Sequence, residues 1–192
     1  MKVQLKELAE IQMGYPFRGA IVPGTGDGVA VIQMSDLGES MSPDCSTLCR
    51  VDIDEIKSGH RIRENDVIFR SRGNFPAGYW IKSPAKDCVA AAPLLRIRMK
   101  SNALHPGYLT WYLRQEAAQS YFESSSQGSS LRMVGIDVLK QLEVPLVQLD
   151  LQTRIAELAK LSEQEAVLSR RLQERKKVYI NSIINHRIGE KR

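Results

Sequence analysis

The sequence has few of the residues from which metal and disulfide sites are built. Its 192 residues include only three cysteines and three histidines. An odd number of cysteines excludes a complete disulfide framework within one chain. Cys45 and Cys49 are four residues apart with no histidine near them, and Cys88 is the only further cysteine. Because a structural zinc site needs four ligands in closer pairs, we expect no metal site and no cofactor.

Long apolar runs are also missing. The longest are a few residues, far short of the roughly 20 that span a bilayer. The N-terminal segment Met1–Glu7 lacks the apolar centre of a signal peptide. We therefore expect a cytoplasmic protein with no membrane partner. A hydrophobic content of 43% is enough for one core-forming domain of about 150 residues and an additional helix.

No grouping of residues predicts catalysis. The histidines are scattered, and the order of residues supports no serine-histidine-carboxylate triad. The glycine-rich segment Pro23–Gly28 precedes an expected strand at Val29–Met34 rather than the helix that a phosphate-binding loop opens, so we interpret it as a hairpin turn. Glu64–Asp66 lacks the further acidic and lysine residues of a nuclease site. An enzyme is therefore not expected.

What the sequence does have is an uneven distribution of charge. The net charge is +5 and the pI is about 9.2. Residues 27–55 are mainly acidic, whereas residues 60–100 are mainly basic and include amide and aromatic side chains. That composition suits contact with phosphates and base edges. Arg96 and Arg98 alternate along an expected strand, and we assign both to its solvent-facing side.

One expected strand ends at a basic loop. The apolar residues that follow Asp66 indicate a buried strand leading into a glycine-containing loop with arginine and asparagine. Arginine can donate two hydrogen bonds to guanine, and asparagine can pair with adenine. A second polar loop, at residues 124–130, is rich in serine. We predict seven DNA contacts: Arg70, Arg72, Asn74, Lys82, Gln127, Ser129 and Arg132.

From Pro106 the pattern changes from strand to helix. Residues between Tyr108 and Phe122 give an apolar face over about four turns, and we assign its aromatic residues to the core rather than to base stacking. A brief helix at Ile136–Leu142 and a closing strand at Val144–Val147 follow. The elements together predict an α+β fold.

A single long helix is predicted from Asp150 to about Ile188. Neither proline nor glycine interrupts it before Gly189, and at 1.5 Å per residue it is about 55–60 Å long. Apolar residues recur at alternating steps of three and four, as in a coiled coil, with Glu165 and Arg175 on the same stripe. The stripe either meets a partner helix or folds back on its own domain. We predict a dimer interface of Leu151, Ile155, Leu158, Leu161, Leu168, Leu172, Tyr179 and Ile183.

Several segments occur together in an order that identifies a family resemblance. They are Leu8–Gly14 followed by Phe17, Asn65–Ile68 with Gly73, Gly107–Leu113, Leu139–Leu146 after a loop containing serine and glycine, and Leu151–Ala156. In this order they resemble the target recognition domain of the specificity (S) subunit of type I restriction-modification enzymes. The resemblance extends over nearly the whole chain.

The resemblance implies two parts. They are a mixed α/β target recognition domain at residues 1–149 and a C-terminal coiled-coil helix at residues 150–192. The family commonly has a proline pair and then glutamate-glutamine before the helix, whereas residues 147–152 keep only the glutamine. Full-length S subunits contain two recognition domains and two such helices, so this chain resembles half a subunit. An antiparallel homodimer through the helices would regenerate the family arrangement.

The resemblance also implies a function. The chain would be a non-catalytic, sequence-specific subunit that reads two half-sites in double-stranded DNA. It would direct partner methyltransferase (modification) and motor-endonuclease (restriction) subunits to that DNA. The alternative is a stand-alone DNA-binding or protein-interaction module, either a regulator or an orphan fragment, without restriction-modification partners. A methyltransferase gene beside this one would favour the first interpretation.

Overall fold

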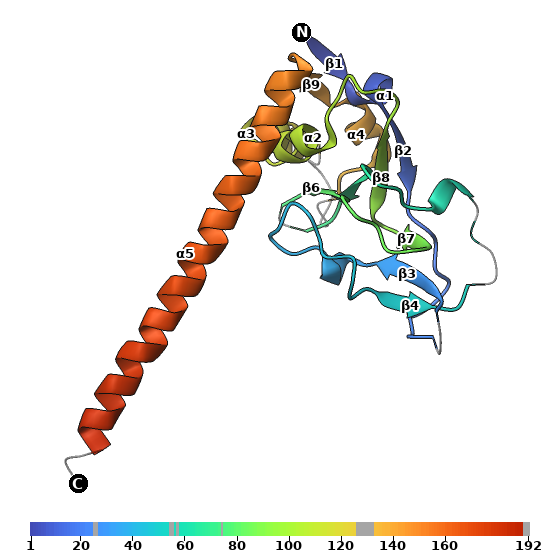
Figure 1. Ribbon diagram of the computed structural model, residues 1–192. Coiled ribbons are helices and arrows are strands. Elements are labelled where there is room, and N and C mark those ends of the chain that lie inside the picture. The colour runs from blue at the N-terminus through green and yellow to red at the C-terminus, as the bar shows by residue number, and fades with distance from the viewer. Residues whose placement is uncertain (25–26, 54–55, 57, 74, 126–132, 190–192) are drawn as a thin grey trace. The chain divides into compact units, whose positions relative to one another are not determined.

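The structure is a computed structural model that describes residues 1–24, 27–53, 56, 58–73, 75–125 and 133–189 (Figure 1). It divides into two compact units, Met1–Ala156 and Glu157–Arg192. Its strands and helices confirm the α+β class. Among the residues described, no helix combines the length and the apolar character needed to cross a membrane.

The centre of the first unit is an antiparallel sheet of four strands in the order β2-β8-β5-β6. They are β2 (Ala9–Met13), β8 (Leu95–Met99), β5 (Val67–Arg70) and β6 (Ala77–Trp80). In β5, Val67 and Phe69 belong to one hydrophobic core and Ile68 to another, because successive side chains of a strand point to opposite faces. Both faces of the sheet are therefore buried.

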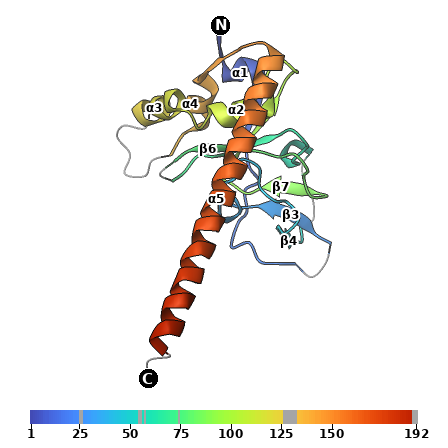
Figure 2. The same cartoon turned by 60° about the vertical axis from the view of Figure 1, so that its left-hand side comes forward.

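Helices cover one face of this sheet (Figures 1 and 2). They are α1 (Leu5–Leu8), α2 (Pro106–Tyr112), α3 (Glu116–Ser125) and α4 (Ile136–Gln141). Tyr108, Tyr112 and Phe122 are buried in the core between helices and sheet, which confirms that these aromatic residues are structural. Gly78 of β6 has no room for a side chain, since a Cβ there would lie 2.7 Å from Cδ1 of Leu113.

The apolar face after Pro106 does not form the single helix that we predicted. The chain turns between α2 and α3, where Arg114 and Gln115 donate backbone hydrogen bonds three residues back. Side-chain amides stabilise this break. Gln115 donates to the Trp111 carbonyl at 3.0 Å and Gln119 donates to the Leu113 carbonyl at 2.6 Å. Helix periodicity alone does not reveal such amide contacts, so the sequence pattern concealed the turn.

A second, three-stranded sheet packs against the opposite face (Figure 1). Its strands are β4 (Cys49–Val51), β3 (Val29–Ile32) and β7 (Cys88–Ala90), with β3 antiparallel to β4 and parallel to β7. Ile32 of β3 shares a core with Ile68 and Tyr79, whereas Val31 faces a third core with Tyr15. Two short 3-10 helices, η1 (Met34–Asp36) and η2 (Ser58–His60), lie in the connections.

The beginning of the chain pairs with the segment that precedes the long helix. Strand β1 (Lys2–Gln4) is antiparallel to β9 (Glu143–Pro145), and the Leu146 amide donates to the Met1 carbonyl at 2.8 Å. Helix α5 (Leu149–Gly189) follows immediately. Its first two turns belong to the first unit.

Gln152 attaches the start of α5 to the domain. Its side chain is fully buried. Its Oε1 accepts from the His105 amide at 2.8 Å, and its Nε2 donates to the carbonyls of Ala103 and Val147 at 2.9 and 2.8 Å. Beside it, Gly107 has no space for a Cβ, which would lie 2.9 Å from the Cβ of Ala156. Gln152, in the first turn of α5, therefore uses every polar atom of its amide.

The second unit consists of the remainder of α5, and its apolar stripe is exposed. Ile155, still in the first unit, is half-buried against the helix-side core. The seven other predicted interface residues are between 43% and 67% exposed: Leu151, Leu158, Leu161, Leu168, Leu172, Tyr179 and Ile183. Burial of these side chains in a dimer interface remains a prediction.

We predict that Gln152→Ala lowers the free energy of unfolding by about 2–4 kcal/mol, because three backbone groups lose the hydrogen-bond partner that this buried amide provides. Urea denaturation followed by tryptophan fluorescence measures the change. Gln148→Ala is the control, since Gln148 is exposed four residues earlier, and it should change stability by less than about 0.5 kcal/mol. Equal effects of the two substitutions would show that the buried contacts do not stabilise the domain.

Candidate nucleic-acid interface

The β5–β6 hairpin separates the predicted DNA contacts into two groups. Arg70 pairs with Ala77 next to the hairpin loop, residues 71–76, whereas Val67 pairs with Trp80 at the other end. Arg72 lies on the loop, and Lys82 follows β6 beyond the opposite end. Since each strand residue advances about 3.3 Å, the two ends of the paired strands are about 10 Å apart. Arg72 and Lys82 therefore start from opposite ends of the hairpin.

The hairpin loop lies beside the segment that follows the serine-rich loop. Arg72 forms an antiparallel bridge with Met133 and donates from Nε to the Met133 sulfur at 3.2 Å. The Val134 amide donates to the Ser71 carbonyl at 2.9 Å. Two segments some 60 residues apart are therefore adjacent. Four predicted contacts, Asn74, Gln127, Ser129 and Arg132, lie outside the described residues.

Arg70 is held by the protein itself. Its Nη1 donates to the Leu37 carbonyl at 3.1 Å and its Nη2 donates to the Phe75 carbonyl at 3.3 Å. The guanidinium also lies over the Tyr79 ring, 5.7 Å from the centroid. We predicted a base contact for Arg70. These contacts instead favour a structural role, in which Arg70 connects two loops.

The loop at residues 37–40 has each of its four carbonyls bound. Arg70 binds the first, and the Tyr79 hydroxyl donates to the Gly38 carbonyl at 3.0 Å. Arg114 donates to the carbonyls of Glu39 and Ser40 at 3.0 and 3.3 Å, with its guanidinium 5.0 Å from the Tyr79 ring centroid. Two arginines and a tyrosine therefore stabilise this connection, which has no regular secondary structure.

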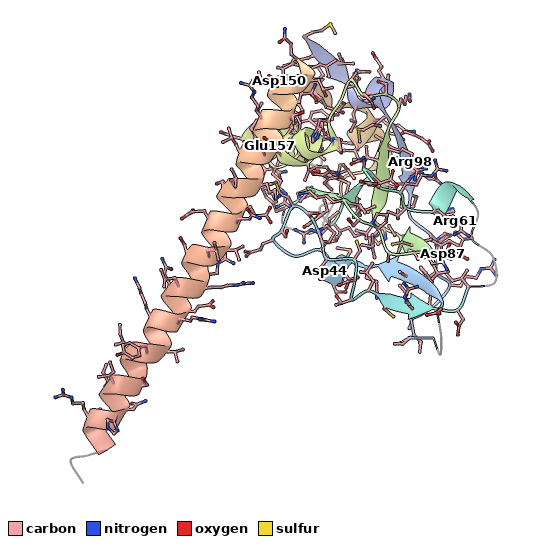
Figure 3. The ribbon with its side chains drawn as sticks, viewed as in Figure 1. Asp44, Arg61, Asp87, Arg98, Asp150 and Glu157 are labelled. Atoms are coloured by element: carbon pink, nitrogen blue, oxygen red, sulfur yellow. The ribbon has the colours of Figure 1, made fainter. Side chains whose placement is uncertain are left out.

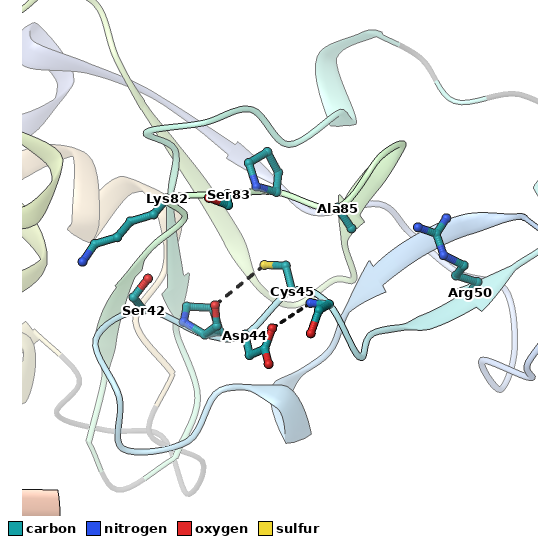
Figure 4. A pocket seen from close by; sticks show the side chains of 10 residues that line it. Ser42, Asp44, Cys45, Arg50, Lys82, Ser83 and Ala85 are labelled. Carbon is teal, nitrogen blue, oxygen red and sulfur yellow. Dashed lines mark hydrogen bonds between the residues drawn. The ribbon is translucent and has the colours of Figure 1, made fainter. Parts of the chain in front are cut away.

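Lys82 contributes to the wall of a surface cavity of about 490 Å³. Its ammonium nitrogen is 4.5 Å from the centroid of the Trp80 ring. Figure 4 shows Lys82 and Arg50 on opposite sides of the cavity, with Asp44 and Cys45 between them. The pKa of Asp44 is lowered by hydrogen bonds from the Ser46 side chain and amide, so its carboxylate opposes the cations. Asp44 therefore offsets part of the positive charge that Lys82 and Arg50 give to the lining.

We predicted that Arg98 faces solvent, and this prediction was wrong. It donates from Nε and Nη2 to the two oxygens of Asp66, each at 2.7 Å, and the Asp66 side chain is 1% exposed. Arg61, which forms an ion pair with Asp87, accepts from Arg98 at its carbonyl oxygen (Figure 3). The three labelled residues Arg61, Asp87 and Arg98 form part of a structural network of charges.

Arg96 is buried more deeply than Arg98. Its side chain is 3% exposed and donates from Nη2 to Glu10 at 2.7 Å and to Gln12 at 2.9 Å. Burial, followed by the nearby Arg98 charge, lowers the pKa of Arg96, while Asp66 and Glu10 raise it. The prediction of a solvent-facing side failed because a second layer covers that face of the sheet, so alternation does not identify water-exposed positions here.

Buried thiols occupy the core between the sheets. Cys45 and Cys88 both belong to it, and all three cysteines are free. Burial raises the pKa of Cys45, and burial together with the neighbouring Cys45 raises the pKa of Cys88 to about 12. Such thiols are poor nucleophiles and metal ligands. In the part of the chain that the structure describes, no cluster of histidine, cysteine and carboxylate side chains could hold a metal ion.

The comparison with families identifies the chain. A family model described as the type I restriction modification DNA specificity domain matches residues 1–174. The chain belongs to this family. The match includes the central sheet, the hairpin loop, the serine-rich loop at residues 124–130 and the first 26 residues of α5. No curated protein sequence matches the chain.

Solved structures share the fold of this specificity domain. The HsdS subunit from Thermoanaerobacter tengcongensis is 22% identical, with a TM-score of 0.62 over 88% of this chain and 39% of that chain. A chain from a structure of complex assembly and conformational transition in the type I R-M system is 20% identical, with a TM-score of 0.69 over 95% of this chain and 43% of that chain. The S subunit from M. genitalium is 14% identical, with a TM-score of 0.53 over 85% of this chain and 39% of that chain. This specificity domain spans about two fifths of the length of these chains.

The two hairpin arginines should respond differently to substitution. Arg70→Ala should lower the free energy of unfolding by about 1–3 kcal/mol, because two loop carbonyls and the Tyr79 ring lose their partner. Arg72→Ala should change it by less than about 0.5 kcal/mol, because that side chain is exposed. Urea denaturation of both variants measures the difference, and a larger loss for Arg72→Ala would reverse the two assignments.

Proposed function

We propose that the chain is a non-catalytic DNA-recognition subunit of a type I restriction-modification complex. The observation that supports this most strongly is the family match across residues 1–174, which includes the domain and most of its helix. The basic sequence supports it as well, because positive charge favours a polyanionic partner. The chain reads short sequences in double-stranded DNA, while methyltransferase and motor-endonuclease subunits do the chemistry.

In this proposal the hairpin loop makes the base contacts. Arg72 is exposed there and lies beside Met133, directly after the serine-rich loop. The predicted contact Asn74 belongs to the hairpin loop, Gln127 and Ser129 belong to the serine-rich loop, and Arg132 follows that loop closely. Lys82, at the other end of the hairpin, contacts the phosphate backbone. Arg70 positions the loop through its hydrogen bond to the Phe75 carbonyl.

The functional form is a homodimer through antiparallel α5 helices. The exposed apolar stripe supports this assembly, because burial of that many large side chains in one seam stabilises a coiled coil. A two-fold axis through the helix pair relates two identical domains. The stripe from Leu151 to Ile183 is about 48 Å long at 1.5 Å per residue, which corresponds to about 14 base pairs of B-DNA. The target is therefore an interrupted inverted repeat.

A selection from random duplexes tests the dimer and its DNA recognition together. The wild-type chain should recover two copies of one half-site, inverted and at constant spacing. Leu168→Lys should recover a single half-site, because a charge in the apolar seam destroys the dimer. Ala166→Lys adds the same side chain about 160° away around the helix and should still recover both copies. In sedimentation experiments the wild-type protein and Ala166→Lys should be dimers, whereas Leu168→Lys should be a monomer.

Two results would contradict the proposal. Failure of the wild-type protein to enrich any sequence would contradict sequence recognition. Enrichment of paired half-sites by Leu168→Lys would instead contradict dimerisation through this stripe while leaving recognition intact.

A further inference from the structure

Hydrogen bonds attach residues on both sides of the hairpin turn to the domain. The Phe75 carbonyl accepts from Arg70, and the next carbonyl, that of Pro76, accepts from Gln119 at 2.9 Å. On the other side of the turn, the Ser71 hydroxyl donates to the Pro93 carbonyl at 3.0 Å. Gly73 between them has φ +109°, a conformation that a residue with a side chain rarely adopts. Described residues on both sides of the turn are therefore anchored to the domain.

Large hydrophobic side chains are exposed on this loop and beside it. Phe75 and Met133 are each 43% exposed, and Arg72 contacts Met133. Met13 is also 43% exposed at the same end of the sheet, since it pairs with Leu95, which in turn pairs with Phe69 beside the loop. Within the described part of residues 1–148, only two other large hydrophobic side chains are exposed, Met1 and Val22.

An exposed apolar surface beside a guanidinium is chemically specific. In the major groove, guanine presents two acceptors that suit arginine, and thymine presents its 5-methyl group. The minor groove displays neither the methyl group nor the same pair of acceptors.

We propose that Phe75 and Met133 form an apolar contact for the 5-methyl group of a thymine, next to a guanine bound by Arg72. This inference rests on the proposed DNA-recognition function and identifies the base that one part of the loop reads. More than half of the Phe75 surface is covered by protein. The ring therefore touches a methyl group from the groove and does not enter the base stack, which would require it to be free on both faces.

Replacement of thymine by deoxyuridine tests the contact, because it removes only the methyl group. Each thymine of the selected duplex is replaced singly, and affinity is measured for the full-length protein. We expect one thymine per half-site, adjacent to a guanine, at which the replacement lowers affinity about fourfold, the equivalent of one buried methyl group. Other thymines should show no change.

Protein variants assign the effect to the loop. Phe75→Ala should bind the thymine duplex about fourfold more weakly and should no longer distinguish thymine from deoxyuridine at that position. Phe75→Leu keeps an apolar side chain and should retain part of the difference. Val22→Ala removes an apolar side chain that is 68% exposed elsewhere, and it should bind and discriminate like the wild-type protein. Urea denaturation verifies that each variant is folded.

The outcomes separate this inference from the proposed function. A selected target without thymine, or one at which no deoxyuridine replacement matters, would overturn the methyl contact while recognition stands. The same would follow if Phe75→Ala discriminated as the wild type does. Failure of the wild-type protein to select any sequence would instead refute the proposed function on which the inference rests.

Discussion

The buried amide of Gln152 is the contact that joins the beginning of α5 to the recognition domain. Its three hydrogen bonds reach residues 103 and 105 in the loop before α2 and residue 147 before α5 itself. The same region contains Gly107, which Ala156 and the Trp80 ring approach too closely for any side chain. Because buried polar groups are costly when unpaired, this arrangement disfavours any packing of the first two helical turns that breaks these hydrogen bonds.

Burial on both faces of the central sheet determines which cations remain available for DNA. Arg96 and Arg98 lie on a covered face and are neutralised by Glu10 and Asp66, and Arg70 binds loop carbonyls. Much of the positive charge in residues 60–100 is therefore structural. What is left for a ligand lies on loops at the ends of strands, positioned by a rigid scaffold, as is common for binding residues.

Local patterns predicted the elements well, while their surroundings were harder to infer. The buried strand before Arg70, the brief helix at 136 and the long terminal helix all followed from hydrophobic periodicity. The exposure of Arg96 was wrong because the second sheet is formed by strands distant in sequence. The role of Arg70 depends on carbonyls 33 and 5 residues away, and the proximity of Arg72 to Met133 spans 61 residues. No local pattern encodes such contacts.

Adenine methylation in the source genome tests the central claim most directly, because a recognition subunit directs a methyltransferase to its target. Long-read sequencing would compare cells in which this gene is intact with cells in which it is deleted. Our account predicts that deletion abolishes methylation at one interrupted palindromic motif. Loss at an asymmetric, two-part motif would contradict the homodimer and indicate a different second half. An unchanged methylation pattern would contradict the assignment to an active modification complex and would favour a stand-alone DNA-binding module.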